Sequence, residues 1–390
     1  MDPIGPNLTD LSARVSMVSV QDRRVFIETT LMTTHHLPAA GIDIGYFSVK
    51  YTLGRQEKRL ICGSFPALAP RANVHTAAAD TTLGATDVIK VPIGTSAYYV
   101  GPDAALMRSS RAPRLVLDDY STRPEYQALL TGALYQIARH HLAERRGNEL
   151  TITNLVVGLP LSTMQEFKKH VQQMCLGTHT LPSLPKQDHP LLVHVENCTV
   201  IAQPHGTIMS TSARAGASKS DAQPVNQIVL DMGGGTFDWF TVRDDRVVLD
   251  LCGAHARGML AAANAVADAI KPGLREDPFM IERIDHAIRE RSPTVSVMGT
   301  ARPLEPHQPL VDALINECLD RMIDSVVSMG SMDQVIVTGG GARRVAEVLE
   351  KRMPELKDMI TVDEDPVFSN VRGFHLVAEM LNTRRAKVAA

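Results

Sequence analysis

Two landmarks in this 390-residue chain each occur twice, at nearly the same spacing. An apolar strand that reaches Asp-x-Gly occurs at Asp43 and again at Asp231, 188 residues later (231 − 43). An apolar strand that ends in glycine before a helix occurs at Gly158 and again at Gly339, 181 residues later (339 − 158). Landmarks that recur in the same order predict two halves with one shared topology. The spacing is far too long for a stack of short repeats, so we expect two related domains that face each other.

Between the landmarks, short apolar strands and Gly-rich turns alternate with amphipathic helices, which is typical of an α/β protein. The clearest helix is predicted over 123–145, where apolar residues recur at helical spacing. Further helices are predicted over 162–175, 257–270, 279–291, 308–328 and 342–353.

The sequence also predicts how the chain divides into domains. An N-terminal extension is expected over 1–37, with a possible short strand at 24–29. The remaining expected parts are a first domain at 38–206 with an inserted subdomain at about 66–115, a Ser- and Ala-rich mobile loop at 207–226, and a second domain at 227–390 with an inserted subdomain at about 271–330.

Composition excludes several classes of protein. The 40 Lys and Arg against 43 Asp and Glu give a formal net charge of −3, whereas proteins that coat nucleic acid carry a large basic excess. We therefore expect no direct nucleic-acid binding. Five scattered cysteines without a CxxC pair are typical of reduced thiols in a cytosolic protein. No apolar run approaches the roughly 18–20 residues of a membrane span, and no signal peptide is evident, so a cytoplasmic protein without membrane contact is expected.

The sequence lacks GxxxxGK[ST], a strand-linked GxGxxG, HExxH and GxSxG, which excludes the P-loop, Rossmann, zincin and hydrolase sites that these motifs build. Three Gly-rich turns remain. The turn after Asp231 has three glycines, which let backbone amides approach an anion closely, and Asp231 is placed to hold hydrated Mg²⁺ beside phosphates. The alternative is a tight hairpin turn with a capping Asp.

The other two turns carry weaker signals. Asp43 precedes a turn with one glycine, and Lys50 on the returning strand could reach a phosphate oxygen. Taken alone, this turn favours an ordinary hairpin over a phosphate site. The glycines from 339 to 341 open a helix whose N–H groups suit close packing against a nucleoside or its phosphate. The alternative there is a plain connection between a strand and a helix.

With all three turns in this order, the sequence resembles the actin, heat-shock-chaperone and sugar-kinase superfamily over about residues 40–380. DMGGGTFD (231–238) is similar to the chaperone hairpin, DIGYFSVK (43–50) has Lys seven residues after Asp as in actins, and VTGGGA (337–342) is similar to the adenosine turn. The resemblance implies an α/β fold of two duplicated actin-like (RNase H-like) domains with a nucleotide cleft between them, each with a smaller inserted subdomain.

The resemblance also implies ATP and Mg²⁺ as cofactors, with Asp43 and Asp231 ordering the magnesium through water. Gln203 would orient the attacking water, so Gln203 and Asp231 form the implied catalytic pair, and hydrolysis should be slow and conformationally gated. The alternative for Gln203 is a polar hinge residue. The remaining implied nucleotide contacts are Gly45, Tyr46, Phe47, Ser48, Lys50, Gly233, Gly234, Gly235 and Thr236 at the phosphates, and Gly339, Gly340, Gly341 and Ala342 at the adenosine.

Within the superfamily, the size of the chain resembles that of the bacterial actin-like proteins. The segment 365–374 contains Asn-x-x-Gly-Phe and is similar to an element of ParM-type plasmid-segregation actins, and 253–258 is similar to their turn beside the nucleotide. The implied function is an ATPase that polymerises with ATP into filaments, for plasmid or DNA segregation through a DNA-binding adaptor protein. A non-polymerising ATPase or phosphotransferase of the same fold, and a scaffold with a degenerate site, are the alternatives.

Overall fold

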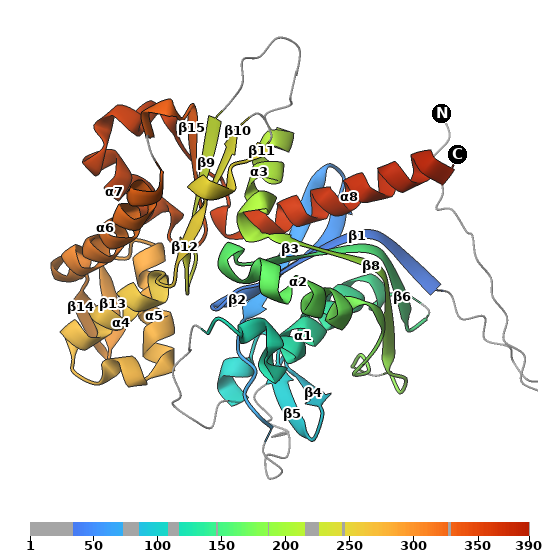
Figure 1. Ribbon diagram of the computed structural model, residues 1–390. Helices are drawn as coiled ribbons and strands as arrows, with labels where there is room; N and C mark the ends of the chain where they lie inside the picture. Colours follow the sequence, from blue (N-terminus) through green and yellow to red (C-terminus); the bar gives the residue numbers. More distant parts are fainter. Residues whose placement is uncertain are drawn as a thin grey trace, which may run out of the picture.

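The computed structural model describes residues 34–72, 86–107, 117–145, 147–185, 187–214, 226–243, 246–326 and 329–389. These residues form two α/β lobes, each built on its own β-sheet (Figure 1). The possible strand at 24–29 lies outside the described residues.

The first lobe is built on a six-stranded sheet with the order β3-β2-β1-β6-β8-β7. Its central strands β1, β6 and β8 are parallel, while β2 runs antiparallel to β1. The strands are β1 (Thr34–Ile44), β2 (Ser48–Gln56), β3 (Arg59–Pro66), β6 (Glu149–Leu159), β7 (Gly177–Leu181) and β8 (Leu191–Ala202).

The second lobe is built on a sheet with the order β11-β10-β9-β15-β16, and β12 pairs with β10 beside it. Here β9, β15 and β16 are parallel, and β10 runs antiparallel to β9. The strands are β9 (Asn226–Met232), β10 (Phe237–Arg243), β11 (Arg246–Val247), β12 (Gly253–His255), β15 (Gln334–Thr338) and β16 (Ile360–Val362).

The two sheets share one topology, which confirms the predicted duplication. Strands β9, β10, β11, β15 and β16 take the same places and directions as β1, β2, β3, β6 and β8. The register agrees as well. Asp43 pairs with Gly158 at the end of β6, and Asp231 pairs with Thr338 at the end of β15. Each Asp therefore stands at the same edge of its sheet.

Helices cover both sheets close to the predicted positions. They are α1 (Pro124–Leu142), α2 (Leu161–Cys175), α3 (Gln203–Arg214), α4 (Met259–Ile270), α5 (Pro278–Arg289), α6 (Gln308–Ser325), α7 (Ala342–Arg352) and α8 (Ser369–Ala389). The insertions add two hairpins, β4 (Ile89–Ile93) with β5 (Ser96–Val100) and β13 (Thr294–Val297) with β14 (Thr300–Pro303). Both hairpins bury apolar side chains in the main core of their own lobe, so neither insertion has a separate core among the described residues.

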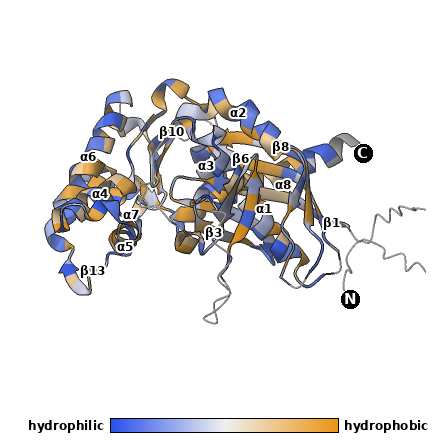
Figure 2. Ribbon diagram, turned by 90° about the horizontal axis from the view of Figure 1, so that it is seen from below, coloured by the Kyte–Doolittle hydropathy of each residue, from blue (hydrophilic) through white to orange (hydrophobic). Residues whose placement is uncertain are grey.

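Each lobe has one large hydrophobic core, and two smaller clusters join the lobes. In Figure 2 the strands β6 and β8 carry mostly hydrophobic colouring, as expected for buried parallel strands. Helix α3, which follows the first sheet, packs Ile208 against Val229 and Phe240 of the second sheet. Helix α8, which follows the second sheet, packs Phe374 against Ala39 of the first sheet. The lobes therefore exchange their last helices.

Two predicted boundaries are wrong. Residues 207–214 belong to helix α3 and not to a mobile loop, and the rest of that predicted loop, 215–225, lies outside the described residues. Small residues of this kind are typical of a linker. Thr207 and Ser210 are nevertheless buried, because α3 packs closely against α8. The predicted extension also ends too late, since β1 begins at Thr34 and pairs there with Glu149 of β6.

None of the helices among the described residues is long and apolar enough to cross a lipid bilayer.

Candidate functional site

A cleft that is open to solvent lies between the lobes. Both Asp-bearing hairpins, the start of α3 and the Gly-rich turn before α7 line it. The predicted site residues that line it are Asp43, Gly45, Tyr46, Phe47, Ser48, Lys50, Gln203, Asp231, Gly233, Gly234, Gly235, Thr236, Gly339 and Gly340. Gly341 lines an adjoining cavity, and Ala342 is buried in the hydrophobic core of the second lobe.

The first hairpin joins β1 to β2 and holds Asp43 in the cleft. Its turn is closed by the Gly45 N–H, which donates to the Ser48 carbonyl at 3.2 Å. Asp43 is 2% exposed, and both of its carboxylate oxygens are engaged. Lys50 Nζ lies 3.1 Å from Oδ2, and Gln203 Nε2 donates to Oδ1 at 2.7 Å. The structure therefore brings Asp43, Lys50 and Gln203 together.

The second hairpin joins β9 to β10, and the start of α4 supports its turn. The N–H groups of Met259 and Leu260 donate to the carbonyls of Gly233 and Gly234 at 3.0 and 2.9 Å. A Cβ atom on Gly258 would lie 2.6 Å from the Gly233 carbonyl oxygen, so this close approach requires glycine. Helix α4 thus occupies carbonyl groups that would otherwise repel an anion in the cleft.

The two hairpins touch each other across the cleft. A Cβ atom on Gly234 would lie 2.7 Å from the Cβ of Phe47, which places the first turn directly against the second. Tyr46 fastens the first turn to its own lobe, because its hydroxyl donates to the Leu117 carbonyl at 2.8 Å and its ring stacks on Tyr120 at 4.9 Å. A ligand that enters between the turns would contact both lobes.

Asp231 is also buried, at 7% exposed. Asn370 Nδ2 donates to Asp231 Oδ2 at 2.6 Å, and a Cβ atom on Gly339 would lie 2.4 Å from Oδ1. Gly339 has a φ of 85°, which also favours glycine. Burial raises the pKa of Asp231 to about 6; the bond from Asn370 opposes this rise, and the negative charge of Asp43 adds to it. A cation between the two carboxylates would relieve this unfavourable burial of charge.

Sequence reasoning assigned no role to Asp238, although it belongs to the DMGGGTFD motif. Its carboxylate is 2% exposed, and the Thr236 side chain and the Leu161 backbone at the start of α2 are near enough to oppose a rise in its pKa. Burial, and next the charge of Asp231, raise the pKa of Asp238 to about 7. Among the described residues, its Oδ1 atom has no hydrogen-bond partner. Asp238 therefore lines the cleft close to the start of α2 in the first lobe.

Sequence reasoning also missed Arg289, and no local signal marks it. Its guanidinium lies 5.5 Å from the centre of the Phe47 ring and pairs with Asp285 at 2.8 Å. Arg289 lines both the cleft and an adjoining open cavity, which Gly340 and Gly341 also line. This outer cavity offers room beside the Gly-rich turn for the rest of a ligand whose anionic end lies between the hairpins.

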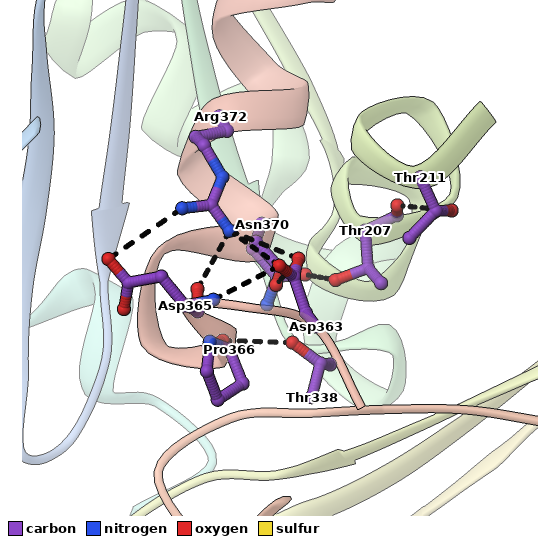
Figure 3. Close-up of polar contacts among 9 residues, drawn as sticks. Thr207, Thr211, Thr338, Asp363, Asp365, Pro366, Asn370 and Arg372 are labelled. Carbon is purple, nitrogen blue, oxygen red and sulfur yellow. Dashed lines mark hydrogen bonds and ion pairs between the residues drawn. The ribbon is translucent and has the colours of Figure 1, made fainter. Parts of the chain in front are cut away.

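The segment between β16 and α8 forms a wall shared by the cleft and the outer cavity. The Pro366 carbonyl accepts from Thr338 Oγ1 at 2.9 Å and from the Gly339 N–H at 3.1 Å. Arg372 Nη2 donates to both carboxylate oxygens of the buried Asp363 at 3.0 Å, as Figure 3 shows. These bonds hold the wall against the Gly-rich turn.

The donor set fits hydrated Mg²⁺. Two of the carboxylates that line the cleft, those of Asp43 and Asp231, lie at the edges of the two sheets. In the part of the chain that the structure describes, no three His, Cys, Asp or Glu side chains form a complete metal cage. Mg²⁺ is usually held by one or two carboxylates together with water and substrate phosphates, so a small donor set of this kind suits it.

Comparison with known proteins agrees with this arrangement. Residues 41–206 match the family of actin-like proteins, at the N-terminal domain of its members. The chain has the actin-like fold. No curated protein sequence matches it.

Solved structures with this fold extend the match beyond the first lobe. The actin-like protein Alp7A is 14% identical, with a TM-score of 0.68 over 92% of this chain and 100% of that one. ParM in a 15-stranded filament from Clostridium botulinum is 19% identical, with a TM-score of 0.65 over 90% and 100%. The archaeal actin homologue Ta0583, in complex with ADP, is 18% identical, with a TM-score of 0.63 over 87% and 99%. The actin-like fold therefore covers both lobes.

Proposed function

We propose that this actin-like protein is an ATPase that binds Mg·ATP in the cleft and polymerises with it into filaments. The observation that carries the proposal is the pair of Asp-bearing hairpins, Asp43 and Asp231, that face each other across one cleft. Two relatives by fold add support, since ParM forms a filament and Ta0583 binds ADP. A nucleotide held by both hairpins would couple its own state to the closure of the lobes.

In this proposal, different residues of the cleft have different roles in hydrolysis. The turn amides and Lys50 would bind the phosphates, while Asp43 and Asp231 would hold hydrated Mg²⁺, which when bound neutralises phosphate charge. Gln203 would orient the attacking water, and it now donates to Asp43 at 2.7 Å. A neutral amide orients water but is a poor proton acceptor, so hydrolysis should be slow.

We further propose that the filament works in the cytoplasm and segregates plasmid or other DNA through a DNA-binding adaptor protein. The net charge of −3 supports an adaptor, because direct binding to DNA usually uses a basic surface. The fold shared with ParM supports this class of cargo.

Light scattering and pelleting with ATP and Mg²⁺ test the proposal. We expect assembly to require both, to raise the rate of phosphate release, and to disappear in Asp231→Ala. If the protein hydrolyses ATP but stays unassembled over a wide concentration range, the filament is ruled out. If Asp231→Ala binds and hydrolyses ATP as the parent does, the cleft is not the ATPase site.

A second candidate function, phosphoryl transfer to a small acceptor, is favoured by one feature of the inner cleft. Ser121 and Tyr126 line it, are 4% and 1% exposed, and have hydroxyls without a hydrogen-bond partner among the described residues. An acceptor molecule bound there would satisfy these groups. Transfer predicts that a hydroxylated acceptor accelerates ADP formation without equal phosphate release.

A further inference from the structure

Helices α3 and α8 cross at a pair of glycines directly beside the cleft. A Cβ atom on Gly373 of α8 would lie 1.7 Å from the Gly206 carbonyl oxygen of α3. A Cβ atom on Gly206 would in turn lie 2.3 Å from the Asn370 carbonyl oxygen. This contact leaves no room for sliding, so the first turns of the two helices form one rigid unit.

A buried chain of hydrogen bonds runs from this crossing to Asp231. Thr207 Oγ1 of α3 donates to Asn370 Oδ1 of α8 at 2.7 Å (Figure 3). Asn370 Nδ2 then donates to Asp231 Oδ2 at 2.6 Å. Thr207 is fully buried and Asn370 is 8% exposed, so water does not compete well for these bonds. The negative charge of Asp231 fixes the NH₂ end of the amide toward the cleft, and Thr207 holds the other end.

The duplicated topology gives this contact a counterpart in the first lobe. Gln203 is the first residue of α3, after β8, and it donates to Asp43. Asn370 is the second residue of α8, after β16, and it donates to Asp231. Each half of the chain thus ends its sheet with an amide side chain aimed at its own Asp. Within the part of the chain that the structure describes, only the second amide has a further bond to a side chain of the other half.

We propose that Asn370, held by Thr207, is a positioning residue that sets the direction of the Asp231 carboxylate for hydrated Mg²⁺. The inference rests on the proposed nucleotide site. Mg²⁺ demands near-ideal geometry, so a carboxylate that turns freely holds its waters poorly. Partners that orient a metal-binding carboxylate contribute about 10-fold to 100-fold to metal affinity.

The test measures the affinity of a fluorescent ATP analogue, once in EDTA and once in Mg²⁺, for the full chain and its variants. Thr207→Val keeps the shape of the side chain and removes the bond to Asn370, while Asn370→Ala removes the amide. Thr211→Val is the matched control, because Thr211 lies one turn further along α3 and donates only to the carbonyls of Thr207 and Ile208 among the described residues. Thermal unfolding in EDTA checks that each variant folds.

We expect the parent and Thr211→Val to bind the analogue more tightly in Mg²⁺ than in EDTA. Asn370→Ala should keep its affinity in EDTA and lose about 10-fold or more of its affinity in Mg²⁺, and Thr207→Val should lose part of it. Equal losses in EDTA and Mg²⁺ would show a merely structural role, and unchanged affinity would show no role. Either result overturns the inference. If the parent itself binds no nucleotide, the proposed function fails instead, and the inference fails with it.

Discussion

At the scale of single residues, the site is set by buried carboxylates held close to one another. Asp43, Asp231 and Asp238 are all less than a tenth exposed, and Asp43 and Asp231 each accept a hydrogen bond from an amide side chain. Such burial costs free energy in the empty cleft and is relieved when a cation enters. We therefore expect the protein to have a lower free energy of unfolding without a bound cation than with one.

The variant Asp231→Asn tests this free-energy cost through the pH dependence of protein stability. Burial raises the pKa of Asp231 from 3.8 to about 6, so the folded state binds the proton more readily than the unfolded state. Its favourable contribution is complete below pH 4 and is lost as the pH rises through 6. In EDTA at pH 8, Asp231→Asn should raise the free energy of unfolding by on the order of 1–3 kcal/mol.

Urea unfolding of the parent and of Asp231→Asn at several pH values measures the difference. The gain should shrink as the pH falls through 6 and vanish below about pH 3.8, where Asp231 is protonated in both the folded and the unfolded state. With Mg²⁺ present, the same variant should lose ATP hydrolysis, which separates stability from function. A gain in the free energy of unfolding that does not depend on pH would show that the buried charge of Asp231 is not its cause.

His375 gives the opposite dependence on pH. It is 3% exposed, Nδ1 lies 2.9 Å from Thr52 Oγ1, and burial lowers its pKa from 6.5 to about 4. The unfolded state therefore takes up a proton first, and stability is lost as the pH falls from 6.5 to 4. His375→Gln should flatten this loss in urea unfolding at pH 7 and pH 5. The exposed His170→Gln serves as the control.

Most of the predicted site residues line one cleft because they follow strands that end at the same edge of a sheet. The residues that sequence reasoning missed reach the cleft from distant elements. Asn370 lies 139 positions from Asp231, and Arg289 contacts a ring in the other half of the chain. Local patterns carry no information on such contacts, because they depend on how the two lobes pack together.

At the scale of elements, helices with a strong apolar period were predicted well, as α1 shows. The failure at 207–214 has a physical reason. Small and hydroxylated residues are frequent both in linkers and where two helices approach closely, and only tertiary packing separates these cases. Helix α3 is an example of close helix packing, because Gly206 lies against the backbone of α8.

Gly373→Ala should test that close approach. The added Cβ would meet the Gly206 backbone at 1.7 Å, so α3 and α8 would have to separate. We expect a loss of about 1–3 kcal/mol or more in the free energy of unfolding, measured in urea. Met380→Ala, which changes an exposed side chain of the same helix, should change it far less. A nearly neutral Gly373→Ala would show that the crossing is loose.

At the scale of the whole molecule, the lobes are joined by an exchange of helices. Helix α8 buries Val371, Phe374 and Ala378 against β1 and β6 of the first sheet. A chain that stops before Ser369 should therefore expose that face. We expect this truncated chain to aggregate or to lose cooperative unfolding, measured by size-exclusion chromatography and circular dichroism. A truncated chain that stays monomeric and unfolds cooperatively would contradict this dependence.

The exchange of helices also sets an order of events during synthesis. The strands that present Ala39 and Val156 leave the ribosome early, but the helix that covers them comes from residues 369–389. The first lobe must wait, with one face of its sheet uncovered, until the second lobe has been translated. The hairpin that carries Asp43 therefore gains its finished support only when the hairpin of the second lobe already exists, so a half-made chain has no complete cleft.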